Sequence, residues 1–202
     1  MKGHINFTDE YVLENEVVLM RPLLAADFEN LITFSLAQPQ LWKYSLITAA
    51  GPDNLRNYLQ IAEEGRNEQK EYPFIVFDKK TNQYAGSTRF YDILPNFQTL
   101  QLGYTWYGEQ FQGTGLNKNC KYLLLEFAFE KWNMERVEFR AGNENVKSIA
   151  AMKSIGCKVD GILRCNMPKR EGGRRDSIVL SILKSEWENE VKETLRRKIE
   201  AF

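Results

Sequence analysis

Alternating apolar and polar positions along the chain predict seven β-strands, and apolar positions at helical spacing predict helices between them. Runs rich in β-branched and aromatic residues mark the strands at residues 17–21, 72–78, 84–93, 100–107, 136–141, 157–167 and 176–183. Helical spacing begins near residues 28, 53, 116, 145 and 185. The three strands within residues 72–107 follow one another directly, which is typical of antiparallel pairing. The pattern therefore predicts helices packed on a β-sheet.

The helix predicted for residues 116–132 is apolar on two sides. Only Asn119, Glu126 and Glu130 form a clearly polar face along it. A helix with two apolar sides packs between layers of a fold, so its position is rigid. We expect that rigidity to fix the loop at the N-terminus of the helix.

A glycine-bearing turn, residues 110–115, joins the strand at residues 100–107 to this helix. At such a junction several backbone N–H groups have no partner and point the same way, at the positive end of the helix dipole. That arrangement favours binding of a phosphate or pyrophosphate. Gly113 and Gly115 leave the backbone bare, so an anion can approach it without meeting a Cβ atom.

Two other phosphate-binding loops do not fit the residues of this turn. A dinucleotide-binding fold needs a third glycine where the chain has Lys118, and no βαβ unit surrounds the turn. A nucleotide P-loop needs a lysine where the chain has Thr114. What remains is a loop that holds pyrophosphate by backbone groups alone, or a tight turn that merely requires small residues.

A second motif follows the strand at residues 136–141. Asn143 and Asn145 precede a short helix, Ser148 lies in its first turn, and Gly156 closes it. Asparagine before a helix and glycine after it are ordinary capping residues. Capping alone does not explain the joint spacing of this helix and the glycine turn.

Both motifs resemble those of the GNAT acetyltransferases. The Gln-x-x-Gly-x-Gly pattern of residues 110–115 is similar to motif A of that family, and Asn145, Ser148 and Gly156 match the helix that follows it. Further segments are similar to the Rim-type branch, the ribosomal-protein N-terminal acetyltransferases: Gly86-Ser-Thr-Arg89, Gly103-Tyr-Thr-Trp106, Gly113-Thr-Gly-Leu-Asn117, Gly161-Ile-Leu-Arg164, Arg175-Asp176 and Glu186-Trp187. The resemblance extends over about residues 15–190.

The resemblance implies the GNAT acyl-CoA N-acyltransferase fold, an α+β (three-layer α/β) arrangement. Its centre is a mixed, mostly antiparallel, seven-stranded sheet flanked by helices, with a further helix at the C-terminus. In the family the fourth and fifth strands splay apart and admit the pantetheine arm of coenzyme A. The corresponding segments here are residues 100–107 and 136–141.

Acetyl-CoA is the cofactor that the resemblance implies, and no metal ion is implied. Matching the family's positions onto this chain gives the following cofactor-binding residues: Trp106, Tyr107, Gln112, Gly113, Thr114, Gly115, Leu116, Asn117, Asn145 and Ser148. Backbone groups near Trp106 and Tyr107 would pair with the pantetheine arm as a missing strand would.

The implied reaction is acetyl transfer from the thioester to a primary amine by direct attack in a ternary complex. Ser148 matches a serine that is proposed in the family to hydrogen-bond the thiol sulfur. We therefore assign Ser148 the catalytic role of acid or thiolate-stabilising donor. The alternative for this serine is simple packing in the first turn of a helix.

Two expected catalytic side chains are replaced. Many relatives have a tyrosine acid where this chain has Met152, and relatives of this branch often have a glutamate where it has Gln101. A thioether cannot donate a proton, and an amide cannot usefully accept one. The identity of the general base is left undetermined. The candidates are Asp92, Glu109 and a water chain to solvent.

The acceptor is either a protein N-terminus, as the Rim resemblance suggests, or a small amine. By comparison with relatives, the candidate substrate-binding residues are Trp42, Arg89, Tyr91 and Tyr104, although each also suits the core or the surface. Because the tyrosine acid and the glutamate are both replaced, an acyl-CoA-binding sensor with little or no turnover is the alternative function.

Length and charge limit the remaining possibilities. We expect a single domain at residues 15–202, preceded by a flexible tail at residues 1–14. Lysine plus arginine and aspartate plus glutamate both number 27, so no net field favours nucleic acid or a membrane surface. No apolar run approaches the roughly 20 residues of a membrane span, and no apolar segment at the start suggests a signal peptide. These features favour a cytoplasmic monomer or homodimer.

Cysteine and histidine usage narrows the chemistry. Cys120, Cys157 and Cys165 are widely spaced, which predicts buried, reduced thiols without zinc or disulfides. The only histidine of the sequence, His4, lies in the expected tail. Nucleophilic triads and histidine-ligated metal sites therefore lack a plausible base or ligand. Carboxylates, hydroxyl groups, backbone donors and the cofactor must carry the chemistry.

Overall fold

Eight strands form one sheet at the centre of the computed structural model, which describes residues 5–170 and 172–201. In chain order the strands are β1 (Leu13–Glu14), β2 (Val18–Pro22), β3 (Tyr72–Asp78), β4 (Gln83–Leu94), β5 (Thr99–Tyr107), β6 (Arg136–Gly142), β7 (Lys158–Pro168) and β8 (Arg174–Leu183). They lie side by side in the order β1-β2-β3-β4-β5-β6-β8-β7. The β5–β6 pair is parallel and the other pairs are antiparallel, which confirms the predicted mixed, mostly antiparallel sheet.

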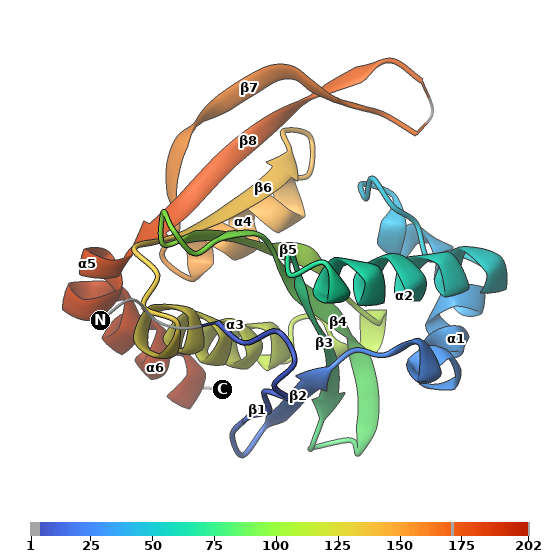
Figure 1. The fold of residues 1–202 in the computed structure, drawn as a ribbon, viewed down its shortest axis with the longest axis horizontal. Helices are drawn as coiled ribbons and strands as arrows, with labels where there is room; N and C mark the ends of the chain where they lie inside the picture. Colours follow the sequence, from blue (N-terminus) through green and yellow to red (C-terminus); the bar gives the residue numbers. More distant parts are fainter. Residues whose placement is uncertain (1–4, 171, 202) are drawn as a thin grey trace.

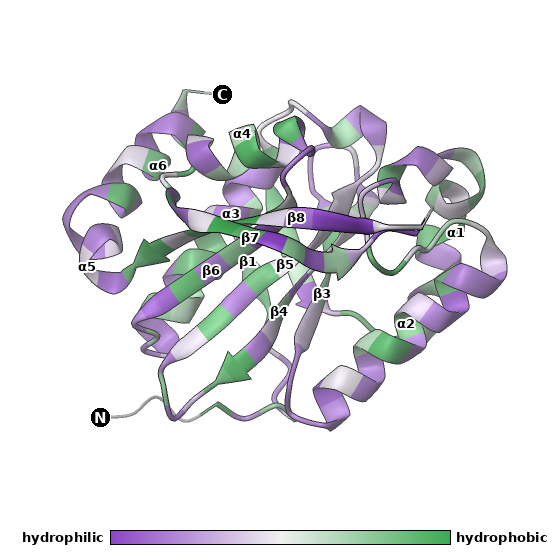
Figure 2. Ribbon diagram, turned by 90° about the horizontal axis from the view of Figure 1, so that it is seen from above, coloured by the Kyte–Doolittle hydropathy of each residue, from purple (hydrophilic) through white to green (hydrophobic). Residues whose placement is uncertain are grey.

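Helices cover both faces of this sheet. In chain order they are η1 (Ala25–Asp27), α1 (Phe28–Ala37), η2 (Pro39–Trp42), α2 (Pro52–Asn67), η3 (Glu109–Phe111), α3 (Leu116–Glu126), η4 (Phe127–Lys131), α4 (Val146–Ser154), α5 (Lys184–Glu186), η5 (Trp187–Val191) and α6 (Lys192–Glu200). Figure 1 shows their arrangement, and Figure 2 shows α1 and α2 on one side of the sheet with α4 and α6 on the other. Because α3 packs against α6, it belongs to the second helical layer. The three-layer arrangement is thus as predicted.

The central strands are continuously apolar because helices cover both of their faces. Within β3 only Phe77 is not buried. On β4, Phe90 packs against Phe127 and Trp132, with ring centroids 6.4 and 5.2 Å apart. These contacts link the sheet to the segment that follows α3, and they hold α3 in place.

Strands β5 and β6 separate soon after they begin. Their parallel pairing runs from Thr99 opposite Arg136 to Gln101 opposite Glu138. Beyond that point β5 continues to pair with β4, and β6 continues to pair with β8. The sheet therefore divides between residues 102–107 of β5 and residues 139–142 of β6, at the position where the resemblance expects a splay.

The N-terminal segment departs from the expected flexible tail at residues 1–14. Phe7 is buried, and the ring of Tyr11 packs against Tyr72 and Trp132 at centroid distances of 5.3 and 5.7 Å. Leu13–Glu14 pairs with β2 and adds an eighth strand to the seven predicted. The expectation was wrong for residues 5–14 because two rings from the core bind this polar segment; residues 1–4, with His4, lie outside the described part.

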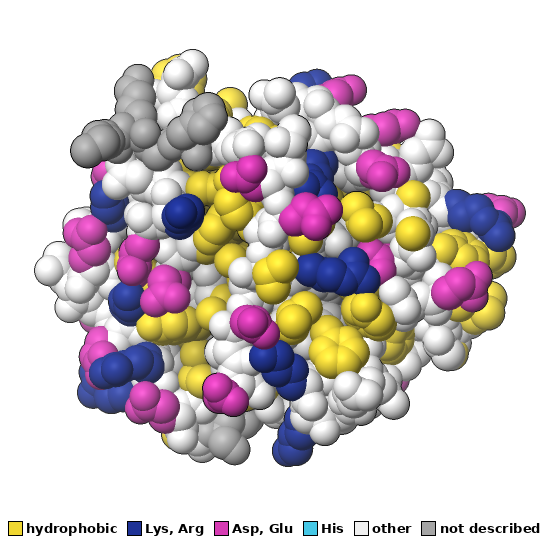
Figure 3. All heavy atoms as spheres, turned by 60° about the horizontal axis from the view of Figure 1, so that its bottom comes forward, with side chains coloured by type: hydrophobic (Ala, Val, Ile, Leu, Met, Phe, Trp, Pro, Cys, Tyr) yellow, Lys and Arg dark blue, Asp and Glu magenta, His cyan; other side chains and the backbone are white. Residues whose placement is uncertain are grey.

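The surface carries mixed charges and one exposed cysteine. On the face in Figure 3, acidic and basic side chains are interspersed with apolar ones. Cys120 and Cys157 are buried as predicted, but Cys165 is exposed because it lies on the outer strand β7. Within the described ranges, no helix combines the length and apolarity that crossing a membrane would require.

Candidate active site

The turn before α3 holds the chain in a conformation that favours glycine. Gly113 has φ +78° and Gly115, the N-cap of α3, has φ +88°. Residues with a side chain rarely adopt these angles. A Cβ atom added at Gly113 would meet no heavy atom within 4 Å, so the space beside this backbone is open. The turn thus combines free space with the N-terminus of an 11-residue helix, as binding of an anion requires.

Side chains hold this turn from within. Thr114 Oγ1 donates a 2.8 Å hydrogen bond to the carbonyl of Phe111, whose ring is buried in the core. Gln112 Nε2 donates a 2.9 Å hydrogen bond to the carbonyl of Tyr107 at the end of β5. The turn is therefore fixed to the sheet as well as to the helix.

Asn119 supports the same turn, although the sequence pattern placed it on a polar helix face. It is 2% exposed, and its Nδ2 donates a 3.1 Å hydrogen bond to the carbonyl of Gly115. Its Oδ1 accepts a 2.8 Å hydrogen bond from Asn15 Nδ2. The expectation was wrong because a buried amide is stable once both of its ends have partners, and periodicity does not reveal such partners.

The start of α4 lies beside the glycine turn. Asn145 caps α4, and its Oδ1 accepts a 3.2 Å hydrogen bond from the backbone N–H of Ser148. Lys147, in the first turn of α4, donates a hydrogen bond from Nζ to Gln112 Oε1. The two motifs found in the sequence are therefore in direct contact, although these two residues are 35 positions apart.

Ser148 lies on the side of α4 that turns toward the core. Met152 and Ile155 follow it at helical spacing, and they are 7% and 2% exposed. Ser148 itself is half-buried. Among the described residues, none forms a hydrogen bond with its hydroxyl group, so this donor remains available to a ligand.

The other predicted cofactor-binding residues offer mainly backbone groups. The side chain of Trp106 is buried against Trp42, with ring centroids 4.8 Å apart. The buried Tyr107 hydroxyl group lies beside the Cys120 thiol, and burial raises the pKa of both groups, to about 12 for the thiol. Because these side chains face the core, β5 can present only its main chain at this end.

Leu116 and Asn117 open helix α3. Leu116 is buried, and Asn117 is half-buried. The side-chain oxygen of Asn117 is buried without a hydrogen-bond partner among the described residues. Asn117 thus lies in the first turn of α3, directly after the glycine turn.

Two of the four predicted acceptor residues are fully enclosed. Trp42 is 1% exposed and Arg89 is 0% exposed. The Arg89 guanidinium lies over the rings of Tyr58 and Tyr104, 5.0 and 4.3 Å from their centroids, and donates a 2.6 Å hydrogen bond to Glu71. Arg89 therefore positions Tyr104 from beneath and does not line an open surface.

Tyr91 and Tyr104 are half-buried and lie against each other. Their ring centroids are 5.0 Å apart in an edge-to-face contact on the sheet face opposite α3. Burial raises the pKa of both phenol groups above the ordinary value. Both hydroxyl groups therefore stay protonated near neutral pH and can donate hydrogen bonds to an acceptor.

Asp92 lies next to the position where the family's glutamate is replaced. Gln101 Nε2 donates a 2.8 Å hydrogen bond to Asp92 Oδ2. Asp92 is exposed on an irregular part of β4, with φ +46°. The other candidate base, Glu109, lies at η3 and accepts a 2.8 Å hydrogen bond from Gln40 Nε2 of η2. The two carboxylates therefore occupy different parts of the site.

The β7–β8 hairpin forms hydrogen bonds with the end of η2 and with the segment that follows it. Arg170 Nη1 donates a 3.2 Å hydrogen bond to the carbonyl of Trp42, and Arg175 Nη1 donates one of 2.7 Å to the carbonyl of Tyr44. Figure 1 shows the hairpin extending beyond the rest of the sheet. These two contacts join the hairpin to Trp42, one of the predicted acceptor residues, and to the residues that follow it.

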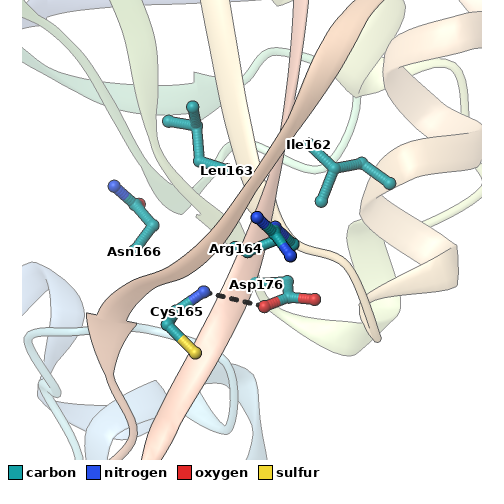
Figure 4. A pocket seen from close by; sticks show the side chains of 6 residues that line it. All are labelled: Ile162, Leu163, Arg164, Cys165, Asn166 and Asp176. Atoms are coloured by element: carbon teal, nitrogen blue, oxygen red, sulfur yellow. Dashed lines mark hydrogen bonds between the residues drawn. The ribbon is translucent and has the colours of Figure 1, made fainter.

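An open hollow of about 820 Å³ lies along the hairpin itself. Figure 4 shows the residues that line it, and all of them belong to β7 or β8: Ile162, Leu163, Arg164, Cys165, Asn166 and Asp176. The backbone N–H of Cys165 donates a 2.9 Å hydrogen bond to Asp176 Oδ1 there. None of these residues comes from α3 or α4, so this hollow is separate from the predicted cofactor site.

The sequence analysis did not identify Lys121, whose amine could take part in chemistry. Lys121 is 5% exposed on α3, and its Nζ donates a 2.9 Å hydrogen bond to Thr105 Oγ1 on β5. The signal was a lysine in the middle of a helix that is apolar on two sides. Neither the helical spacing nor the family motifs show that this lysine is buried.

Comparison with known proteins finds relatives over most of the chain. A family model described as "Acetyltransferase (GNAT) domain" matches residues 18–158. The Bacillus licheniformis protein named "Uncharacterized N-acetyltransferase p20" is 25% identical over 176 residues, which cover 87% of this chain and 97% of that protein.

Solved structures share the fold. The ribosomal-protein-S5-alanine acetyltransferase from Vibrio fischeri has a TM-score of 0.70 at 19% identity, covering 88% of this chain and 99% of that one. RimJ of Mycobacterium smegmatis, in complex with CoA-disulfide, has a TM-score of 0.77 at 17% identity, covering 94% and 93% of the two chains. Proteins of the Rim type are thus among the structural neighbours.

Proposed function

We propose that this chain, which belongs to the GNAT acetyltransferase family, transfers an acetyl group from acetyl-CoA to a primary amine by direct attack in a ternary complex. One observation carries the proposal. The hydrogen bond from Lys147 to Gln112 joins the start of α4 to the glycine turn, beyond the ends of β5 and β6 that no longer pair with each other. This contact supports a single site that would combine the helix end proposed to bind the anion, the serine hydroxyl group and the divided sheet.

The glycine turn would hold the pyrophosphate of acetyl-CoA. Gly113 offers open space, and the first N–H groups of α3 have no partner within the helix. Bound there, acetyl-CoA supplies an acetyl group already activated as a thioester. Backbone groups of β5 near Trp106 and Tyr107 would bind the pantetheine arm, because β6 no longer pairs with them.

Ser148 would act on the sulfur. Its hydroxyl group is free among the described residues, and Asn145 fixes its backbone through the helix cap. A donor that becomes fully engaged only as negative charge develops on sulfur accelerates the reaction rather than merely tightening binding.

Asp92 is the better of the two candidate bases. It receives a hydrogen bond from Gln101, and Tyr91 and Tyr104 lie on the same strands. A carboxylate so placed can take the proton of an acceptor amine directly or through one water molecule. Glu109 already accepts a hydrogen bond from Gln40 and helps to fix η3 against η2.

The proposed acceptor is the primary amine of a protein N-terminus or of a small molecule. A structural neighbour is named as an acetyltransferase for the alanine of ribosomal protein S5, which supports a protein N-terminus as the acceptor. The Tyr91 and Tyr104 hydroxyl groups and the Asp92 carboxylate can form hydrogen bonds with a primary amine, whether it ends a peptide or belongs to a small molecule.

An assay of CoA release tests the proposal against a sensor function. Purified protein would be incubated with acetyl-CoA, with and without a pooled library of amines and peptides with free N-termini, and free thiol would be measured. Thiol release that depends on an amine supports the transferase. Tight binding of CoA without release for any acceptor would favour the sensor.

A further inference from the structure

Lys121 is a buried lysine without a charged partner. Its Nζ donates one hydrogen bond, to Thr105 Oγ1 at 2.9 Å. An ammonium group has three N–H donors, and the other two have no hydrogen-bond partner within the described ranges. No carboxylate of that part of the chain forms an ion pair with it. Burying a charge in this way is costly unless an anion joins it.

The amine lies where the sheet divides. Thr105 belongs to the part of β5 beyond its last pairing with β6, and Thr105 is itself hydrogen-bonded to Thr88 at 2.7 Å. Nζ is 5.8 Å from the ring centroid of Phe139, in the part of β6 beyond the same pairing. Lys121 therefore reaches from α3 to both diverging strands, along the proposed path of the pantetheine arm.

The groups around Lys121 are neutral. The thiols of Cys120, on α3, and Cys157, after α4, have pKa values raised to about 12 by burial. Burial also lowers the pKa of Lys121 to about 8, so most molecules carry the proton near neutral pH. A group with a pKa in that range is well matched to proton transfer at neutral pH.

The surroundings of Lys121 also include a residue hydrogen-bonded to Met152, which stands where many relatives have a tyrosine acid. Cys157, whose thiol lies close enough to affect the Lys121 amine, donates a 3.2 Å hydrogen bond from its backbone N–H to the carbonyl of Met152. Met152 occupies the position where many relatives have a tyrosine acid. Cys157 therefore connects the surroundings of the Lys121 amine to the main chain of Met152.

We propose that Lys121 is a catalytic residue whose ammonium group faces the sulfur of bound acetyl-CoA, stabilises the departing thiolate and gives it a proton. This rests on the proposed acetyl transfer. As the acceptor nitrogen bonds to the acetyl carbon, the carbon–sulfur bond breaks and its electron pair goes to sulfur. The proton passes from Nζ to sulfur and leaves CoA thiol and a neutral amine. The acceptor nitrogen loses its own proton to the base, and Lys121 regains one from solvent before the next turnover.

Titration of the CoA thiol in the binary complex tests this directly, because the thiolate absorbs in the ultraviolet. The proteins compared would be the wild type, Lys121→Met and, as a matched control, Lys131→Met at an exposed lysine of η4. We expect bound CoA to have a thiol pKa lower by about one unit or more in the wild type and in the control than in Lys121→Met. Turnover of Lys121→Met at saturating acetyl-CoA should fall about 10²-fold or more.

Other outcomes overturn the inference in distinguishable ways. An unchanged thiol pKa in folded Lys121→Met means that the amine does not face the sulfur. A raised thiol pKa with unchanged turnover means that the amine is not a catalytic residue. If Lys121→Met does not fold, Lys121→Gln provides the same comparison. A wild-type protein that binds CoA but acetylates no amine refutes the proposed function, whatever the titration gives.

Discussion

The side-chain amide of Gln101 donates a 2.8 Å hydrogen bond to the carboxylate of Asp92, across strands β5 and β4. Gln101 is buried and Asp92 is exposed, so the amide holds the carboxylate at the surface of the sheet. Relatives of this branch often have a glutamate at the position of Gln101. Under the proposed function, Asp92 on the neighbouring strand β4 supplies a carboxylate.

Asp92→Asn is therefore expected to lower turnover by about 10²-fold or more, because an amide cannot accept the proton of the acceptor amine. CoA affinity should stay the same, since Asp92 lies on β4 and not at the glycine turn. Steady-state kinetics at saturating acetyl-CoA measures the effect. Glu109→Gln is the matched control at the other candidate carboxylate, and it should retain near wild-type turnover; the reverse pattern would assign the base to Glu109.

The glycine turn can be blocked without much strain at Gly113. Asparagine tolerates a positive φ better than most residues, and the open space at Gly113 accepts a side chain. Gly113→Asn should therefore fold normally yet bind CoA at least about tenfold more weakly, since the new side chain occupies the anion's place. Calorimetry measures the affinity. Gly172→Asn is the control, because Gly172 also has a positive φ and open space but lies in the β7–β8 turn. Equal affinities would rule out the turn as the pyrophosphate site.

Ser148→Ala should reduce turnover more than it weakens acetyl-CoA binding. The hydroxyl group would be needed mainly as charge develops on sulfur, and loss of one central donor of this kind costs about 10²-fold in rate. Met152→Tyr is the converse test: Met152 lies one turn further along the same side of α4, and a phenol there could restore turnover to Ser148→Ala. Wild-type turnover in Ser148→Ala, measured where chemistry limits the rate, would leave serine as a packing residue only.

The Arg89 guanidinium pairs with Glu71 and lies over the ring of Tyr104. Loss of this ion pair should lower the stability of the protein. The Arg89 side chain is 1% exposed, so Glu71→Gln leaves a buried guanidinium without its counter-charge. Removing one member of a buried pair costs about 3–5 kcal/mol in the free energy of unfolding. Urea denaturation measures the loss. The control is Glu68→Gln, which removes the exposed partner of Lys70 and should change stability little. Equal effects would mean that Arg89 finds another partner.

The sequence predicted most of the strands and helices well. β3 spans the predicted residues Tyr72–Asp78, and α2 begins at Pro52, because these boundaries depend on local chain chemistry. The contact between Lys147 and Gln112 shows in addition that the two motifs of the family resemblance meet in space. A family resemblance carries that long-range information, which periodicity alone does not contain.

What the sequence did not predict depends on partners from distant segments. Tyr11 packs against core rings, Asn119 bonds with Asn15, and Lys121 reaches under β5. Each residue is polar or lies in a polar stretch, and the local pattern does not show which distant group it contacts. Only the arrangement of the sheet and helices determines which polar groups have buried partners.

Lys121→Met should stabilise the protein near neutral pH and lose that advantage as the pH rises toward about 10.5. Burial lowers the pKa of Lys121 from 10.5 to about 8, so between these values the folded protein binds fewer protons than the unfolded chain. The stability of the wild type therefore rises with pH across this window, and the penalty for burying the ammonium group is fully present below about pH 8. A shift of this size corresponds to roughly 3 kcal/mol, which a methionine avoids. Urea denaturation of Lys121→Met and of the exposed control Lys131→Met, at neutral and at alkaline pH, measures the difference.

A gain in stability that did not change with pH would mean that the gain comes from packing alone. A gain that disappears at alkaline pH, together with lower turnover, would mean that the wild type carries a destabilising charge because the reaction needs it.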